Sequence, residues 1–280
     1  MVAPSGGRGQ GARPCGYTRG MDPTPDDLPP AATPVRPRSR HIYLLPNLLT
    51  TANMFAGFYA ILAAANGRFE AACIAVIVAG VFDGLDGRVA RMTGTTSDFG
   101  VQYDSLSDLL SFGIAPALVM YHWGLAQLAL DGGAWGKVGW AAAFLYVACA
   151  ALRLARFNVS AGSADKRWFI GLASPASAGT MISVVWCFAE LGWSGDEMRW
   201  VALAVTVACA LLMVSRIRFF SFKGWPGDRV PFWFMLLVVA VLVALLIDAP
   251  KVLFAVAIVY IASGPVGWLL QRRRAGSAAA

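Results

Sequence analysis

Successive apolar runs, each long enough to form a membrane-crossing helix, occupy the chain from position 42 to position 271. A helix needs about 20 apolar residues to cross a hydrocarbon core of roughly 30 Å. Only 14% of the residues are charged, whereas soluble domains carry about 25%. The pattern excludes a soluble globular protein and predicts an all-α, polytopic transmembrane helical bundle. We expect about eight spans, at 47–66, 70–91, 98–122, 137–157, 174–193, 198–215, 230–248 and 251–270.

The two ends of the chain differ from this apolar region. The first 40 residues are rich in Gly, Pro and Arg and show no apolar periodicity, so they cannot bury enough surface to order themselves. Met21 is an alternative start to Met1, because the residues before it resemble a low-complexity extension. We expect a disordered N-terminal tail over 1–40, a transmembrane domain over 41–271 and a basic cytoplasmic tail over 272–280.

Positive charge is distributed unevenly among the predicted connections. Nineteen of the 23 Lys and Arg residues fall in the two tails and in every second connection, and the remaining connections carry one each. Cytoplasmic loops of membrane proteins are enriched in Lys and Arg. We therefore predict a multi-pass protein of the cytoplasmic membrane, with both termini and the 88–100 connection in the cytoplasm. The net charge of +7 then reflects topology, and no nucleic-acid partner is expected.

The chain offers few residues for thiol or imidazole chemistry. Its five Cys residues are scattered and include no Cys-x-x-Cys pair, which argues against zinc and against a disulfide framework. Its two His residues, His41 and His122, lie in no H-x-K motif, which excludes a phospholipase-D-like mechanism. Any catalysis must therefore depend on carboxylates, Arg or Lys.

Four aspartates lie at the ends of the second and third predicted spans. Asp83 and Asp86 are three residues apart, and Asp104 and Asp108 are four apart, so each pair shares one face of its helix. The short connection makes the two helices antiparallel neighbours, which brings the pairs together. An ionised carboxylate inside a bilayer costs about 2.5–3.5 kcal/mol, so a cation must compensate the cluster. Oxygen-only ligands favour Mg²⁺, Mn²⁺ or Ca²⁺, and Mg²⁺ is commonly shared with substrate phosphates.

Two other interpretations of the aspartates are open at this point. The acids could be interfacial residues in salt bridges with Arg88, Arg91 or Arg153, or they could form the permeation site of a cation transporter or channel. Permeation sites normally lie near the bilayer midplane, often between internal repeats. The chain shows no internal repeat and its acids lie at predicted cytoplasmic helix ends, which favours an enzyme.

The stretch from Asp83 to Asp108 resembles the signature of the CDP-alcohol phosphatidyltransferase family, D-x2-D-G-x2-A-R-x8-G-x3-D-x3-D. The resemblance implies an integral membrane enzyme that moves a phosphatidyl or similar group from a CDP-linked donor to an alcohol. It also implies release of CMP and a divalent cation, Mg²⁺ or Mn²⁺, as cofactor. Every fixed position is present: Asp83, Asp86, Gly87, Ala90, Arg91, Gly100, Asp104 and Asp108.

The same resemblance implies roles for individual residues. Asp83, Asp86 and Asp104 would bind the metal, while Asp108 would act as the general base and contact a second metal. For Asn47 and Thr50 in the first span, a competing interpretation of their role is N-capping of that helix. The residues expected to contact CDP-diacylglycerol are Asn47, Thr50, Gly87, Ala90, Arg91 and Gly100.

Segments flanking the signature resemble the family members that use serine as the acceptor. This narrower resemblance implies CDP-diacylglycerol and L-serine as substrates, and membrane lipids and a second copy of the chain as partners. The serine carboxylate needs a partner, and we expect Arg153, Arg156 and Asn158 to supply it, although positive-inside topology also explains the two Arg residues. Glycerol 3-phosphate or inositol phosphate are the alternative acceptors. The segments are 46–53, 104–117, 152–158 and 171–176.

Overall fold

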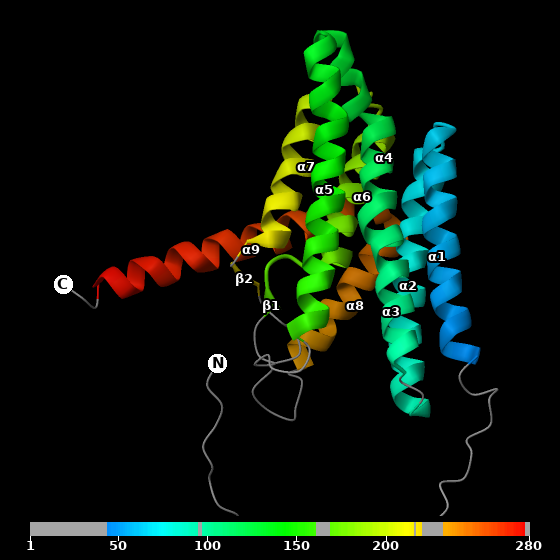
Figure 1. Ribbon diagram of the computed structural model, residues 1–280. Helices are drawn as coiled ribbons and strands as arrows, with labels where there is room; N and C mark the ends of the chain where they lie inside the picture. The colour runs from blue at the N-terminus through cyan, green and yellow to red at the C-terminus, as the bar shows by residue number, and fades with distance from the viewer. Residues whose placement is uncertain (1–43, 95–96, 161–168, 216, 220–231, 278–280) are drawn as a thin grey trace, which may run out of the picture. The chain divides into compact units, whose positions relative to one another are not determined.

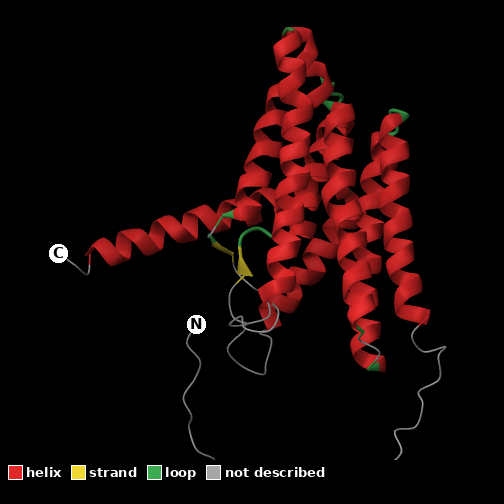
Figure 2. Ribbon diagram, viewed as in Figure 1, coloured by secondary structure: helices red, strands yellow, loops and turns green. Residues whose placement is uncertain are grey.

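Helices account for nearly all of the described chain (Figures 1 and 2). A computed structural model describes residues 44–94, 97–160, 169–215, 217–219 and 232–277. The tail predicted over 1–40 lies outside the described residues. The prediction of an all-α chain is confirmed. The α-helices are α1 (Leu44–Ala65), α2 (Phe69–Thr93), α3 (Asp98–Asp108), α4 (Ala115–Trp123), α5 (Gly133–Ser160), α6 (Ser174–Glu190), α7 (Arg199–Val214), α8 (Phe232–Ile247) and α9 (Ala249–Ser277).

The third predicted span changes its helical geometry along its length. Between α3 and α4 the helix widens into a π-helix, η3 (Leu109–Ile114), and α4 is followed by a 3₁₀-helix, η4 (Leu125–Asp131). The expected span over 98–122 lies within one helical segment, Asp98–Asp131, that is long and apolar enough to cross a membrane, but its geometry is not α-helical throughout. Pro116 supplies the physical reason, because it has no backbone N–H to continue the α-helical hydrogen bonding at that point.

Two short strands were not expected from the sequence. β1 (Phe169–Ile170) and β2 (Arg218–Phe219) pair antiparallel. Directly after β1, Gly171 has a φ of 85°, and its N–H donates to the carbonyl of Ile217 at 2.9 Å. A Cβ on this residue would lie 2.4 Å from the carbonyl oxygen of Met213, so only glycine fits there.

Small side chains allow the helices to approach closely. α1 packs along α2, α5 packs against α7 and η4, and α6 packs against α9 and α2. Alanines are frequent among the buried residues, and a few large side chains, including Phe112, Met120, Tyr146 and Met181, fill the remaining space. Small interior residues are typical of membrane helices, which associate through close packing rather than through exclusion of water.

Large apolar side chains cover the outer faces of the helices, as expected for contact with lipid. Phe55 is 69% exposed and Phe144 is 65% exposed. Three described segments are long and apolar enough to cross a membrane: Leu45–Ala65, Asp98–Asp131 and Gly133–Val159. These segments indicate a membrane protein.

The other predicted spans coincide with helices that are shorter or more highly charged. α6 has 17 residues, and α7 and α8 have 16 each. α2 is 25 residues long but contains two aspartates and two arginines near its C-terminal end. The predicted total of about eight spans stays a prediction.

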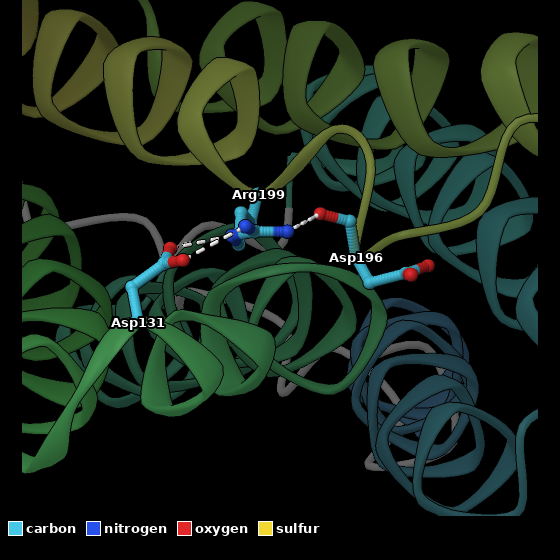
Figure 3. A network of polar contacts seen from close by, with 3 residues as sticks. All are labelled: Asp131, Asp196 and Arg199. Carbon is cyan, nitrogen blue, oxygen red and sulfur yellow. Dashed lines mark hydrogen bonds and ion pairs between the residues drawn. The ribbon is translucent and has the colours of Figure 1, made fainter.

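A charged network joins η4 to the start of α7 (Figure 3). The Nε and Nη2 atoms of Arg199 donate to the Asp131 carboxylate at 2.6 and 2.8 Å, and its Nη1 atom donates to the backbone carbonyl of Asp196. The adjacent backbone of Gly195 lies against the carbonyl of Trp123, where any side chain would clash. These contacts hold the connection before α5 to the connection before α7.

Candidate functional site

The four aspartates lie on α2 and α3, which follow each other in the chain. α2 is followed by Gly94, which has a left-handed conformation (φ 61°) and ends the helix. α3 begins after Ser97, whose hydroxyl accepts a hydrogen bond from the N–H of Gly100 at 3.0 Å. This cap satisfies one of the free N–H groups of the first turn. Acids of α2 and α3 come together, as the sequence predicts.

Three of the carboxylates converge. One oxygen from each of Asp83, Asp104 and Asp108 lies within 4.8 Å of the other two, and all three side chains are partly buried. The Oδ1 atoms of Asp104 and Asp108 are buried and have no hydrogen-bond partner among the described residues. Buried carboxylate oxygens are unfavourable without hydrogen bonds or a cation. The all-oxygen donor set and the unpaired oxygens fit a hard divalent cation.

The fourth carboxylate has a different environment. The side chain of Asp86 is buried, and its Oδ2 atom accepts a hydrogen bond from the Thr50 hydroxyl at 2.8 Å. Thr50 belongs to α1, so this bond ties α1 to α2 beside the converging acids. The structure thus links a predicted metal ligand directly to a predicted donor-binding residue.

The alternative salt bridges are absent from the described part of the chain. No ion pair there joins any of the four aspartates to Arg88, Arg91 or Arg153. Arg88 and Arg91 are exposed. The four carboxylates therefore form no direct ion pair with these three guanidinium groups.

The two predicted site residues of α1 lie inside the helix and not at its N-cap. α1 begins at Leu44, so the competing interpretation of Asn47 and Thr50 as N-capping residues is wrong. The Oδ1 atom of Asn47 lies 3.9 Å from the point that a Cβ on Gly100 would occupy, and the Ser97 hydroxyl lies 3.2 Å from it. Gly100 therefore permits the close approach of α1 to the capped end of α3.

The small residues of α2 leave space beside the acids. A Cβ on Gly84 would meet nothing within 4 Å, and one on Gly87 would meet only the Nη2 atom of Arg91, at 3.9 Å. The Arg91 guanidinium thus extends alongside Gly87, while Ala90 is partly buried. Three predicted donor-binding residues consequently share the helix end that carries Asp86.

The residues predicted to bind the acceptor differ in their surroundings: two contact neighbouring helices and one is exposed. Arg153 is partly buried, its Nη1 atom donates to the Ser174 hydroxyl at 3.0 Å, and its buried Nε atom has no partner among the described residues. The Nδ2 atom of Asn158 donates to the hydroxyl of Ser105, next to Asp104 in α3. Arg156 is exposed. Arg153 and Asn158 therefore face neighbouring helices, whereas Arg156 does not.

Several residues around the acids were not singled out from the sequence. Ser107 donates to the carbonyl of Thr50 and Ser111 donates to the carbonyl of Asn53, each at 3.1 Å. The Asn53 side chain is fully buried, and neither of its amide atoms has a partner among the described residues. The three-residue spacing from Asp104 to Ser107 and from Asp108 to Ser111 is the signal that would have identified these serines.

Comparison with known proteins places these residues in a wider context. A model of the CDP-alcohol phosphatidyltransferase family matches residues 43–212, which include every aspartate of the cluster. A CDP-diacylglycerol–serine O-phosphatidyltransferase of Helicobacter pylori is 43% identical over 146 residues, which cover 52% of this chain and 57% of that protein. The protein of the same name from Mycobacterium leprae is 37% identical over 158 residues, covering 54% and 50% of the two chains.

An archaeal protein is similar to a comparable degree. An archaetidylserine synthase of Methanothermobacter thermautotrophicus is 41% identical over 141 residues, which cover 50% of this chain and 56% of that one. The chain thus matches little more than half the length of these relatives.

Proposed function

The chain belongs to the CDP-alcohol phosphatidyltransferase family, and we propose that it transfers the phosphatidyl group of CDP-diacylglycerol to L-serine, with release of CMP. The observation that supports this most directly is the convergence of Asp83, Asp104 and Asp108, two of them with unpaired buried oxygens. The names of the similar proteins favour serine as the acceptor.

The aspartates would hold a divalent cation, Mg²⁺ or Mn²⁺. Asp83, Asp104 and Asp108 supply converging oxygens, and Asp86 completes the acidic set while Thr50 fixes its orientation. When bound, the cation neutralises charge on the donor diphosphate, which is where phosphoryl transfer most needs stabilisation.

Asp108 is assigned as the general base. The serine hydroxyl oxygen forms a bond to the phosphorus that carries diacylglycerol, and the bond from that phosphorus to the CMP oxygen breaks. The hydroxyl proton passes to the Asp108 carboxylate, and CMP leaves with the electron pair of the broken bond. The free Oδ1 atom of Asp108, which accepts no hydrogen bond from the described residues, supports this assignment.

The donor headgroup would lie over the small residues of α2. Gly87 and Ala90 leave room for the nucleotide, and Arg91 lies beside them with its guanidinium exposed for a phosphate. Asn47 would contact the same headgroup from α1, near Gly100.

Arg153 is a stronger candidate than Arg156 for binding the serine carboxylate. Its guanidinium is partly buried, donates to the Ser174 hydroxyl and retains an unpaired Nε–H within the described structure. Asn158 would support it from the next turns of α5. We expect Arg153→Lys to raise the KM for serine about tenfold or more, because Lys cannot form the bidentate contact. Arg156→Lys is the matched control and should leave this KM unchanged.

The membrane arrangement proposed for the chain has about eight spans, with both termini in the cytoplasm. The acidic end of α2 would then open to the cytoplasm, where soluble serine meets the lipid-borne donor. The proposed partners are membrane lipids and a second copy of the chain.

The direct test is CMP release from CDP-diacylglycerol by the purified full chain in detergent with Mg²⁺ or Mn²⁺. Serine, glycerol 3-phosphate and inositol phosphate are supplied in parallel. Release that depends on serine and on the metal is expected. Release with another acceptor would overturn the choice of serine, and the absence of metal-dependent release from folded protein would support the transporter alternative.

A further inference from the structure

The helix that carries Asp104 and Asp108 changes its geometry immediately after Asp108. In η3 the N–H of Ala115 donates to the carbonyl of Leu110, five residues earlier. An α-helix would require the N–H of Pro116 to donate to the carbonyl of Phe112, and proline has no N–H. The wide turn is therefore a consequence of the position of Pro116, and such turns occur frequently at functional sites.

The wide turn keeps both halves of this long helix facing the interior. Residues four apart in an ideal α-helix are rotated by about 40° relative to each other, so five in succession would spread over about 160°. A π-helical turn contains more residues than an α-helical turn, so it removes much of the rotation between residues four apart. The helix can therefore direct its acids toward α2 while its second half remains in the core. The buried residues that repeat at four-residue spacing are Ser107, Ser111, Ala115, Val119 and Trp123.

Contacts with α1 fix the wide turn on one side. The Ser111 hydroxyl donates to the carbonyl of Asn53 at 3.1 Å, and one turn earlier Ser107 donates to the carbonyl of Thr50. A Cβ on Gly57 would lie 2.5 Å from the Ser111 hydroxyl oxygen, so glycine is required for this approach. Ser107 and Ser111 flank Asp108 in the sequence.

A single tyrosine fixes the turn on the other side. The hydroxyl of Tyr146, in α5, donates to the carbonyl of Phe112 at 3.2 Å, and both side chains are buried. This is the carbonyl that Pro116 leaves without its α-helical donor. Tyr146 thus satisfies a buried acceptor, which would otherwise be costly in the apolar interior.

We propose that Ser111 and Tyr146 are positioning residues for the metal-binding carboxylates. By holding η3 between α1 and α5, they keep Asp108 directed at Asp83. Both act through backbone carbonyls: Ser111 donates to α1, and Tyr146 donates to the turn itself. The inference rests on the proposed function insofar as the three carboxylates bind a divalent cation, and it does not depend on serine being the acceptor.

The test uses electron paramagnetic resonance to measure Mn²⁺ binding by the wild-type protein and by purified full-length variants in detergent. Ser111→Ala and Tyr146→Phe each remove one hydroxyl and leave the helix and ring in place. We expect each to weaken Mn²⁺ binding about tenfold, as is usual for residues that orient metal ligands. The matched controls are Ser183→Ala and Tyr121→Phe. Ser183 is also fully buried, but its hydroxyl bonds to Thr180 of its own helix.

A second readout separates positioning from general stability. The kcat for CMP release should fall about tenfold in both variants, with the KM for serine unchanged. Wild-type Mn²⁺ affinity in folded Tyr146→Phe and Ser111→Ala would overturn the inference. If Ser111→Ala fails to fold, Tyr146→Phe alone decides. If the two variants bind Mn²⁺ more weakly and the wild-type protein shows no serine-dependent CMP release, the positioning role is supported and serine is rejected as the acceptor.

Discussion

Asp108 combines burial, an unpaired oxygen and proximity to two other carboxylates. We expect Asp108→Asn to lower serine-dependent CMP release by about 10²–10⁴-fold, because an amide cannot accept the hydroxyl proton. Asp98→Asn is the control, since Asp98 is an exposed acid in the first turn of the same helix. Equal rates for wild type and Asp108→Asn would rule out the assignment of the general base.

At the same scale, the structure separates residues that the sequence groups together. The predicted metal ligands divide into a converging group of three and Asp86, which bonds to Thr50. Gly100 was expected to contact the donor, and its immediate neighbours are the Ser97 hydroxyl that caps α3 and the Asn47 side chain. Spacing along a helix identifies residues that share a face, but it does not identify the atoms they meet on the next helix.

Among the elements, α1 and η3 depend on a glycine at their contact. Because a Cβ on Gly57 would lie 2.5 Å from the Ser111 hydroxyl, we expect Gly57→Ala to lower the free energy of unfolding by about 1–3 kcal/mol through overpacking. Gly179→Ala is the matched control, because this helical glycine has no atom within 4 Å of an added Cβ. There, alanine should stabilise the helix by about 0.5–1 kcal/mol. Thermal unfolding in detergent measures both changes, and an unchanged midpoint for Gly57→Ala would contradict the close contact.

The π-helix gives a second prediction for an element. Pro116→Ala restores the N–H that an α-helix would donate to Phe112, so the wide turn should shift toward α-helical geometry and rotate Asp108 away from Asp83. We expect Mn²⁺ affinity to fall about tenfold. Pro250→Ala serves as the control, because Pro250 lies in the first turn of α9, where no α-helical donor is needed. Equal losses in the two variants would show that the effect is not specific to η3.

For the whole molecule, the topology can be tested by adding one cysteine to a chain that has Ser in place of Cys15. The four cysteines that this chain keeps are all buried: Cys73, Cys149, Cys187 and Cys209. The α1–α2 connection contains the exposed residue Asn66, and Asp98 lies exposed beyond the far end of α2. The proposed topology puts these two positions on opposite sides of the membrane. A membrane-impermeant maleimide applied to intact bacterial cells should label Asn66→Cys and spare Asp98→Cys until the cells are opened. The reverse labelling would invert the topology and place the carboxylates outside.

The sequence alone determined the helical class, because apolar runs of membrane length leave no other way to satisfy the backbone inside a bilayer. It also determined the identity of the acidic cluster, since the periodicity of a helix places Asp83 with Asp86 and Asp104 with Asp108 on common faces. Both conclusions depend on interactions within single helices or between neighbours in the chain, and such interactions can be read from spacing.

Only the tertiary structure decided which side chains meet across the helices. The bonds from Ser107 and Ser111 to α1, from Thr50 to Asp86 and from Tyr146 to Phe112 join residues more than 30 positions apart. Their formation depends on the rotation and depth of each helix, which packing of the whole bundle sets. The wide turn of η3 had a local signal in Pro116, but its consequence for the carboxylates follows from α1 and α5 holding it in place.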